Sequence, residues 1–247
     1  MADLLLAARG ICVRFGGLIA VDAVDLDVNE GELVGIIGPN GAGKTTFFHT
    51  LSGVVRPSAG RLLVRGRDLT GRAPHLFPRA GIARTFQTPR VFREMSAEAN
   101  VRFGLEFAGR GRRRAHDAFA DARGILAFLG LADVAAVPAG ALTPVRQRLL
   151  EIGMALAARP ELLLLDEVAA GLTEREVEAT ATLIRRLRDE LGLAVVWIEH
   201  AVRALLGTVE RVAVLHQGRK IADGAPEAVA RDPAVVEVYL GADATRP

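Results

Sequence analysis

The sequence predicts an α/β fold built around a mainly parallel sheet, and three observations support that class. Short apolar strands alternate with helices in the last third of the chain, which implies a parallel sheet covered by helices on both faces. The first third contains strands joined by tight turns, and residues 90–150 have helical patterning. We therefore expect a single domain over residues 1–247, with a helical subdomain inserted at residues 90–150.

The composition is that of a folded globular protein. Hydrophobic residues make up 50% of the 247 residues and charged residues 24%, which excludes a disordered chain. A net charge of +2 is too small to argue for nucleic-acid binding. We expect neither a signal peptide nor a membrane span, because no segment approaches the roughly 20 apolar residues that cross a bilayer. The single cysteine, Cys12, fits a reducing compartment.

In the first third, apolar runs bounded by turn residues predict strands over residues 11–15, 23–28, 32–38 and 61–66. A helix from Lys44 to about Ser52 should follow the third strand. Gly53, which comes directly after Ser52, should end this helix. These elements place a glycine-rich turn between a buried strand and a helix.

The middle of the chain is expected to be helical from Ser96 to Leu129. Four apolar residues in its second half fall on one face at helical spacing: Phe119, Ala122, Leu126 and Leu129. The glycine that follows can end the helix.

The last third returns to alternating elements. Residues 161–167 and 193–200 predict buried strands, and between them a capping box at Thr173 opens a helix that runs to Leu191. A hairpin over residues 211–224 and two short helices should complete the chain.

The glycine-rich turn matches the pattern G-x-x-x-x-G-K-[ST], which binds nucleotide phosphates. Glycines let successive backbone N–H groups point inward at phosphate oxygens, and the following helix adds its positive N-terminal end. Lys44 would reach the terminal phosphates and Thr45 would hold Mg²⁺. The residues expected to bind the nucleotide in this loop are Gly38, Asn40, Gly41, Ala42, Gly43, Lys44, Thr45 and Thr46.

A pair of acids, Asp166 and Glu167, ends the predicted strand of four leucines. The carboxyl ends of parallel strands meet at one edge of a sheet, so both acids should lie beside the phosphate loop. Asp166 would hold Mg²⁺, and Glu167 would orient or deprotonate the attacking water. The alternative is a strand-ending acidic pair at a helix cap.

Three single residues have both a structural and a functional interpretation. His200 ends an apolar strand, where a histidine is more often structural, but a contact to the γ-phosphate is expected if that strand lies beside the acids. Gln87 follows another strand and could be an ordinary surface glutamine. Phe15 could belong to the core or stack on an adenine ring.

The order of these features resembles the nucleotide-binding subunits of ABC transporters over essentially the whole chain. The segments GIARTFQTPRVFREMSAEANV, LLLLDEVAAGL and WIEHAVRALL, with a tail at residues 222–247, resemble the larger ATPase subunit of branched-chain amino acid importers. Urea-type importer ATPases are similar around FQTPRVF and remain an alternative. The resemblance implies the ABC ATPase fold, with an N-terminal antiparallel β subdomain.

The resemblance also implies roles for the matching residues. Phe15 would stack on adenine, Gln87 would touch Mg²⁺ or the attacking water and face the membrane subunit, and His200 would contact the γ-phosphate. The catalytic residues would be Glu167, His200 and Gln87, the metal ligands Thr45, Gln87 and Asp166, and the cofactors ATP and Mg²⁺.

The implied partners are a second ATPase subunit, two transmembrane permease subunits and, indirectly, a solute-binding protein. No nucleic acid is expected, and the chain would lie peripherally on the cytoplasmic face of the inner membrane. Family members pair head to tail, so each ATP lies between one subunit's phosphate loop and the other's signature turn, Leu-Ser-x-Gly-Gln or a variant.

The signature turn of this chain departs from that pattern. Leu142 and Thr143 keep the first two roles, and Thr143 still offers a hydroxyl to the nucleotide. Pro144 has no N–H to donate, and Val145 stands where glycine permits close backbone approach. Thr143 and Pro144 nevertheless favour a helix start. We therefore expect an asymmetric pair, in which this chain's phosphate loop meets an intact partner turn while its own turn forms a degenerate site.

Two rival functions come from other classes. A soluble ABC ATPase that acts on nucleic acid would use the basic cluster at residues 110–114, but that cluster is better explained as a solvated loop between two helices of the insert. A nucleotide-gated, non-hydrolytic interaction subunit would fit the poor signature turn, but the intact Glu167 and His200 argue against it.

Overall fold

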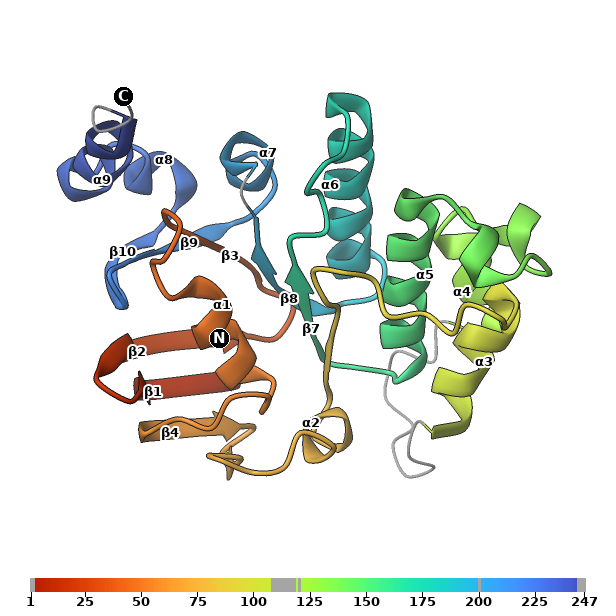
Figure 1. Cartoon of the computed structure of the whole chain (residues 1–247), viewed down its shortest axis with the longest axis horizontal. Coiled ribbons are helices and arrows are strands. Elements are labelled where there is room, and N and C mark those ends of the chain that lie inside the picture. Colours follow the sequence, from red (N-terminus) through yellow and green to blue (C-terminus); the bar gives the residue numbers. More distant parts are fainter. Residues whose placement is uncertain (1–2, 108–118, 120, 200, 244–247) are drawn as a thin grey trace.

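The computed structural model describes residues 3–107, 119, 121–199 and 201–243, and it confirms the predicted α/β class. A six-stranded sheet forms the centre, a four-stranded sheet lies beside it, and three helices of the insert lie on the opposite side (Figure 1).

The central sheet has the strand order β10-β9-β3-β8-β7-β6. All neighbouring pairs are parallel except β10 and β9, which form the predicted hairpin. The strands are β3 (Leu33–Ile37), β6 (Ile82–Arg84), β7 (Leu162–Asp166), β8 (Ala194–Ile198), β9 (Arg211–His216) and β10 (Arg219–Gly224).

Alternate residues of the buried strands serve two separate cores, as the two-residue period of a strand requires. In β7, Leu163 and Leu165 face a core that includes α6 (Glu174–Asp189) and α7 (Val202–Leu206). Leu162 and Leu164 face the other core, which includes α1 (Lys44–Leu51). Helices on one face and the second sheet with α1 on the other therefore hold the central strands in place.

The four-stranded sheet is antiparallel, with the order β2-β1-β4-β5. Its strands are β1 (Leu4–Phe15), β2 (Leu18–Asn29), β4 (Ala59–Val64) and β5 (Arg67–Asp68), and α2 (Leu76–Arg79) follows. The predicted strand at residues 11–15 is only the end of β1. Leu5 and Leu6, which composition alone left unassigned, are fully buried in the core shared with α1.

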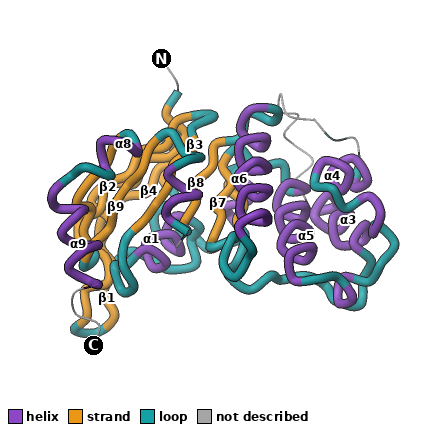
Figure 2. Tube along the Cα trace, turned by 90° about the horizontal axis from the view of Figure 1, so that it is seen from above, coloured by secondary structure: helices purple, strands orange, loops and turns teal. Residues whose placement is uncertain are grey.

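The helical region contains α3 (Ala97–Phe107), α4 (Ala122–Phe128) and α5 (Pro144–Ala157), with short 3₁₀ turns at Ala132–Val134 and Ala139–Ala141. The stretch predicted as helical from residue 96 to 129 thus holds two described helices, and the basic cluster at 110–114 lies outside the described residues. Figure 2 shows α6 between the strands and this group of helices. Within the group, α5 lies against β6, the edge strand of the central sheet.

The end of the described chain packs against the central sheet. The two short helices expected there are α8 (Pro226–Val229) and α9 (Pro233–Asp243), beside β10 in Figure 1. Val229 and Val235 belong to the same core as α6. Over the residues that the structure describes, no helix combines the length and apolar character needed to cross a membrane.

Candidate functional site

The phosphate loop connects β3 to α1, as the motif predicts, and its glycines have backbone conformations that suit no other residue. Gly43, which immediately precedes α1, has a φ of +94°, and a Cβ atom there would lie 2.3 Å from the Ala20 carbonyl oxygen. Gly38 would place a Cβ 2.1 Å from the carbonyl oxygen of Leu215. The loop therefore packs backbone against backbone, and a side chain at either position would displace it.

Lys44 is held at the centre of the loop. Its side chain is buried, and Nζ donates to the carbonyl oxygens of Gly38 at 2.7 Å and Pro39 at 3.0 Å. Burial lowers the pKa of this ammonium group, and the nearby Glu167 carboxylate opposes that shift. The loop thus presents a fixed positive charge at the start of a helix, where an anion is stabilised by exposed N–H groups.

A cavity of about 430 Å³ opens over this loop. Phe15 stands at its rim with 53% of its surface exposed, which excludes the core interpretation of that residue and leaves its ring face accessible. The residues that line the cavity are Phe15, Leu18, Ile19, Ala20, Asn40, Gly41, Gly43, Lys44, Thr45, Thr46 and Glu167. The Phe15 ring at the rim suits the base of a nucleotide, and the cationic loop with Lys44 suits its phosphates.

The acids lie where the parallel sheet predicts. Asp166 is the last residue of β7, and Glu167 follows it in a left-handed conformation with φ of +49°, which is uncommon for a residue other than glycine. The Glu167 N–H donates to the Ile198 carbonyl at the end of β8, at 2.9 Å. Both carboxylates are buried, with 3% and 6% of their residues exposed. Glu167 also borders the phosphate-loop cavity, so the strand ends bring acid and cation to one place.

Gln87 is brought directly to this acid from another strand end. Its Nε2 donates to Glu167 Oε2 at 2.7 Å, across 80 positions of sequence. Gln87 is exposed, as the surface interpretation expects, but this contact also gives it a partner at the site. An amide beside a carboxylate can orient a water molecule while the carboxylate accepts its proton.

Arg84, at the end of β6, is a part of the site that sequence reasoning missed. Its Nη2 lies 3.6 Å from Asp166 Oδ2, and the guanidinium stacks on the Phe86 ring at 4.4 Å. Nη1 donates to Ser52 at 2.9 Å. Burial lowers the pKa of this guanidinium, and Asp166 opposes the shift. The only signal in the sequence was a cation inside a short apolar strand.

Two further acids were missed because their partners are backbone groups. Glu151 of α5 is 5% exposed and accepts from the N–H groups of Phe86 and Arg90. Glu199, at the end of β8, is 2% exposed and accepts from the Ala169 N–H at 2.8 Å. An acid within an otherwise apolar strand or helix face is a detectable signal, because buried charges need partners.

The altered signature turn forms a regular helix start, as predicted. Thr143 is the N-cap of α5, with its hydroxyl accepting from the Arg146 N–H at 3.4 Å, and Pro144 is the first helical residue. Gln147 turns back to donate to the carbonyl oxygens of Ala139 and Leu142, both at 3.1 Å. The polar residues after the turn are thus bonded within the chain.

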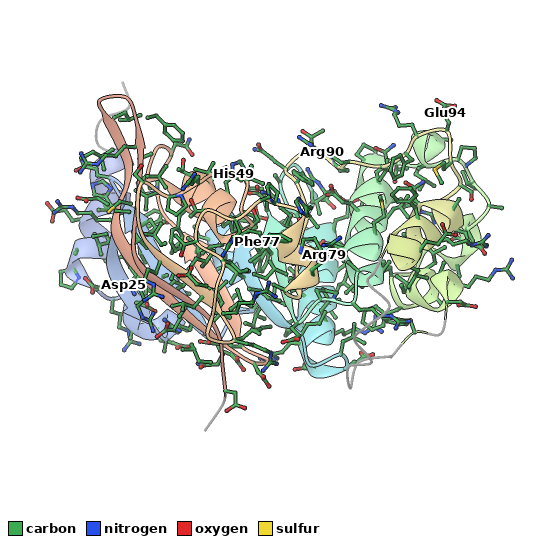
Figure 3. The ribbon with its side chains drawn as sticks, turned by 90° about the horizontal axis from the view of Figure 1, so that it is seen from below. Asp25, His49, Phe77, Arg79, Arg90 and Glu94 are labelled. Atoms are coloured by element: carbon green, nitrogen blue, oxygen red, sulfur yellow. The ribbon has the colours of Figure 1, made fainter. Side chains whose placement is uncertain are left out.

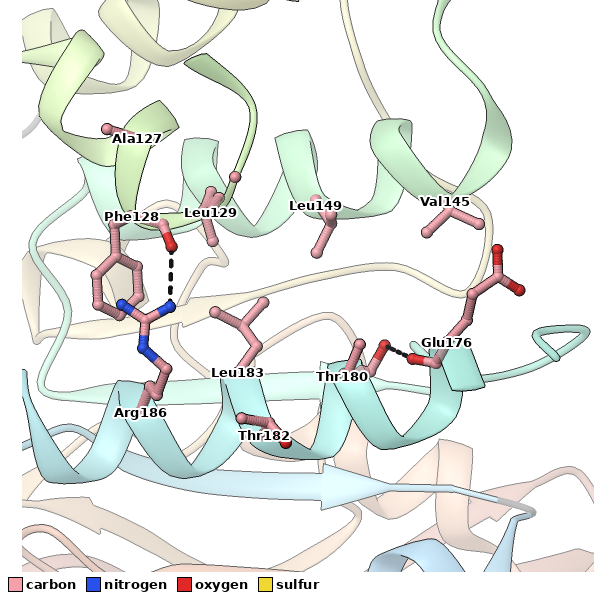
Figure 4. Close-up of a pocket in the computed structure, with 12 residues that line it drawn as sticks. Ala127, Phe128, Leu129, Val145, Leu149, Glu176, Thr180, Thr182, Leu183 and Arg186 are labelled. Carbon is pink, nitrogen blue, oxygen red and sulfur yellow. Dashed lines mark hydrogen bonds between the residues drawn. The ribbon is translucent and has the colours of Figure 1, made fainter. Parts of the chain in front are cut away.

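Val145 sits at one end of a cavity of about 470 Å³ between α5 and α6. In Figure 4 it projects from α5 on the same side as Leu149, toward Glu176 of α6. Its side chain is half-buried in this position. The valine side chain therefore lines this cavity, where glycine would place no side chain.

The residues proposed for magnesium have suitable chemistry. The hydroxyl of Thr45, the amide oxygen of Gln87 and the carboxylate of Asp166 are all oxygen donors, which Mg²⁺ prefers together with substrate phosphates. Thr45 and Glu167 line the phosphate cavity, Gln87 contacts Glu167, and Asp166 is the residue before Glu167. His200 lies outside the described residues, and its contact to the γ-phosphate stays a prediction.

Known proteins resemble this chain along almost its entire length. The ABC transporter family model matches residues 21–170, and the model for the branched-chain amino acid ATP-binding cassette transporter matches residues 219–245. The high-affinity branched-chain amino acid transport ATP-binding protein BraF of Pseudomonas aeruginosa is 38% identical, over 98% of this chain and 99% of that protein. The protein of the same description from Salmonella typhimurium, LivG, is 39% identical over 98% and 99%.

The same similarity extends to solved structures. A crystal structure of the ADP conformation of an ATP-binding cassette of an ABC transporter superimposes with a TM-score of 0.85. Its sequence is 30% identical, and the match covers 96% of this chain and 99% of that chain.

Proposed function

Because this chain belongs to the ABC transporter family and is one of its ATP-hydrolysing subunits, we propose that it powers the import of branched-chain amino acids. The substrate class rests on the full-length similarity to BraF and LivG and on the match of residues 219–245. One observation supports the proposal that ATP is hydrolysed at this chain's own site. It is the hydrogen bond between Gln87 and Glu167 beside the phosphate loop.

Nucleotide binding uses the two ends of the cavity over the phosphate loop. Phe15 would stack on adenine, since its exposed ring stands at the cavity rim. The N–H groups from Gly38 to Thr46 and the Lys44 ammonium would hold the phosphates. Lys44 would exchange its contacts with loop carbonyls for the stronger charged ones with a phosphate.

Hydrolysis would depend on the buried carboxylate of Glu167. Gln87 helps to fix this carboxylate, which can take a proton from a water aligned with the γ-phosphate. Bound Mg²⁺ would neutralise charge on the phosphates, held by Thr45, Asp166 and Gln87. His200 would contact the γ-phosphate from the neighbouring strand end.

We propose that the chain pairs head to tail with a second ATPase subunit, and that the two composite sites are unequal. This chain's phosphate loop, Gln87 and Glu167 would meet an intact turn of the partner. Its own turn, with Pro144 and Val145, offers the partner's ATP fewer backbone donors. One competent and one degenerate site would result.

The membrane partners would be two permease subunits, with the chain peripheral at the cytoplasmic face of the inner membrane. Residues 84–93 are the proposed contact, as part of a groove of about 420 Å³ that includes Arg84, Phe86 and Arg90. Figure 3 shows Arg90 between His49 of α1 and Glu94, along one side of the molecule. Aromatic and arginine side chains in a groove are typical of protein interfaces.

Import of urea or short amides is the alternative within the family, since the ATPase need not touch the transported solute. Isolation of the chain from native membranes in mild detergent tests the proposal. Two multi-span proteins, a second ATPase and an associated solute-binding protein should accompany it, and ligand binding to the latter should identify the substrate. Recovery alone, or with ribosomes or nucleic acid, would contradict the importer function.

A further inference from the structure

Two charged side chains of α5 reach into loops of the site described above. Arg148 and Glu151 are three residues apart, so they project on the same side of the helix. Arg148 bonds to the loop after β7 and Glu151 to the loop after β6. One side of a single helix thus contacts both loops that carry the residues proposed for hydrolysis.

Glu151 holds the backbone on both sides of Gln87. Its two carboxylate oxygens accept from the Phe86 N–H at 3.2 Å and from the Arg90 N–H at 2.9 Å. Hydrogen bonds to an ionised acceptor are about twice as strong as neutral ones, and this acceptor is almost entirely removed from water. A shift of Glu151 would therefore shift the loop that presents the Gln87 amide.

Arg148 holds the backbone immediately after Glu167. Its Nη1 donates to the carbonyl oxygens of Val168 at 3.3 Å and Ala170 at 2.5 Å. On the residue between them, the Ala169 N–H donates to Glu199 at 2.8 Å. Three consecutive residues are thus fixed by a cation from α5 and an anion from the end of β8.

The bond between Gln87 and Glu167 closes these contacts into a ring. Starting from Glu151, the ring passes through the loop at residues 86–90 to Gln87 and Glu167, and returns through residues 168–170 to Arg148. We infer that Arg148 and Glu151 are positioning residues that set the Gln87 amide and the Glu167 carboxylate relative to one another.

This arrangement gives α5 a role in both composite sites. Its first turn, at residues 143–145, faces the partner's ATP under the proposed function, on which this inference rests. Its middle holds the hydrolysis machinery of the chain's own ATP. The turn belongs to one composite site, and Gln87 and Glu167 belong to the other. Because a rigid helix connects them, a movement of the turn also moves Gln87 and Glu167.

Arg148→Met tests this inference in the complex isolated from membranes, because methionine keeps the apolar stem and removes both hydrogen bonds. We expect kcat for ATP hydrolysis to fall at least about 10-fold, since a small misplacement of a catalytic group has effects of this order or more. The dissociation constant for ATP should change less than about twofold. Arg148→Lys keeps a positive charge and N–H donors on a shorter side chain, and it should recover part of the rate.

Arg123→Met is the matched control, because Arg123 lies in the same helical region and its exposed side chain pairs with the Glu98 carboxylate at 3.2 Å. Its kcat should equal that of the wild type. If Arg148→Met assembles poorly, Glu151→Gln replaces it and should show the same split between kcat and ATP affinity. The double variant should lose less than the product of the single effects, because both act through one ring.

A wild-type kcat in both Arg148→Met and Glu151→Gln would overturn the inference. Parallel losses of kcat, ATP affinity and melting temperature would also overturn it, because a purely structural role would lower all three. These results leave the proposed function intact. A wild-type complex without ATP hydrolysis would instead contradict the proposed function itself.

Discussion

Gln87 and Glu167, 80 positions apart in the sequence, are joined by a hydrogen bond of 2.7 Å at the edge of a parallel sheet. Gln87 follows β6 and Glu167 follows β7, the neighbouring parallel strand, so the pairing is a consequence of strand order. Glu167 adopts a left-handed backbone conformation to reach this position, a strain of about 1–3 kcal/mol that the surrounding bonds must offset. Such local strain is most often retained at functional sites.

Replacement of Phe15 should weaken nucleotide binding without affecting the fold. Phe15→Ala removes a ring that is 53% exposed, so little core packing is lost. Stacking of an aromatic ring on a base contributes about 1–3 kcal/mol, which corresponds to a rise of about 5- to 150-fold in the dissociation constant for ATP. A titration with a fluorescent ATP analogue measures it, and Phe15→Tyr should bind as the wild type does. Equal affinity in Phe15→Ala would contradict the stacking role.

Removal of the Lys44 charge should abolish productive binding of phosphates. In Lys44→Met the apolar stem stays in its buried position, while the two bonds to loop carbonyls and the charge are lost. We expect no measurable hydrolysis and greatly weakened binding of ATP, with adenosine affinity nearly unchanged because the base contacts remain. Calorimetric titration with ATP and with adenosine separates the two effects. Retained affinity for ATP would show that the phosphates bind elsewhere.

Restoring glycine in the signature turn should raise turnover of the paired subunits. Val145→Gly permits closer approach of the turn to the partner's nucleotide, at a cost in stability of up to about 1 kcal/mol from the greater backbone freedom of glycine. ATP hydrolysis by the complex and its thermal unfolding are the measurements. Val145→Ala removes the branched methyl groups without the freedom of glycine and should give an intermediate rate. A rate that does not change in Val145→Gly would count against the asymmetric pair.

The buried carboxyl of Glu151 should make stability depend on pH. Burial raises the pKa of this group above its ordinary value of 4.5, more than the N–H groups of Arg90 and Phe86 lower it. The folded state therefore binds more protons than the unfolded state, and this group's contribution to stability falls as pH rises from 4.5 through the folded pKa. Urea unfolding of Glu151→Gln should show a stability that rises relative to wild type across that window.

Glu98 supplies the control of opposite sign. Its bonds with Arg123 and then Arg102 lower its pKa, so its contribution is present above 4.5 and is lost as pH falls through the folded value. Glu98→Gln should therefore lose stability relative to wild type as pH rises toward 4.5. Parallel pH profiles for wild type and Glu151→Gln would contradict this prediction, because they would mean that the pKa of Glu151 is not raised in the folded protein.

Three features could be predicted because each depends on a short stretch of sequence: the phosphate loop, the two acids and the helix start at Thr143. A strand, a glycine turn and a helix N-terminus follow one another along the chain, and parallel strands then bring Asp166 to the same edge. Arg84, Arg148 and Glu199 could not be assigned in this way, because their partners are backbone or side-chain groups 22 to 82 positions distant.

The start of β1 was missed for a different reason. Residues 4–8 form a continuous apolar run without alternation, and such a run does not distinguish a strand from other buried segments. Pairing with β2 on one side and β4 on the other decides its conformation, and both partners come later in the chain.

The measurement that tests the central claim most directly is ATP hydrolysis by the membrane-isolated complex carrying Glu167→Gln in this chain alone. Loss of the acceptor for the water's proton should lower the rate about 100-fold or more, while ATP stays bound. Nearly complete loss is expected, because the partner's site faces the turn with Pro144 and Val145. A rate of about half the wild type would contradict the account, since it would mean that both composite sites hydrolyse ATP equally.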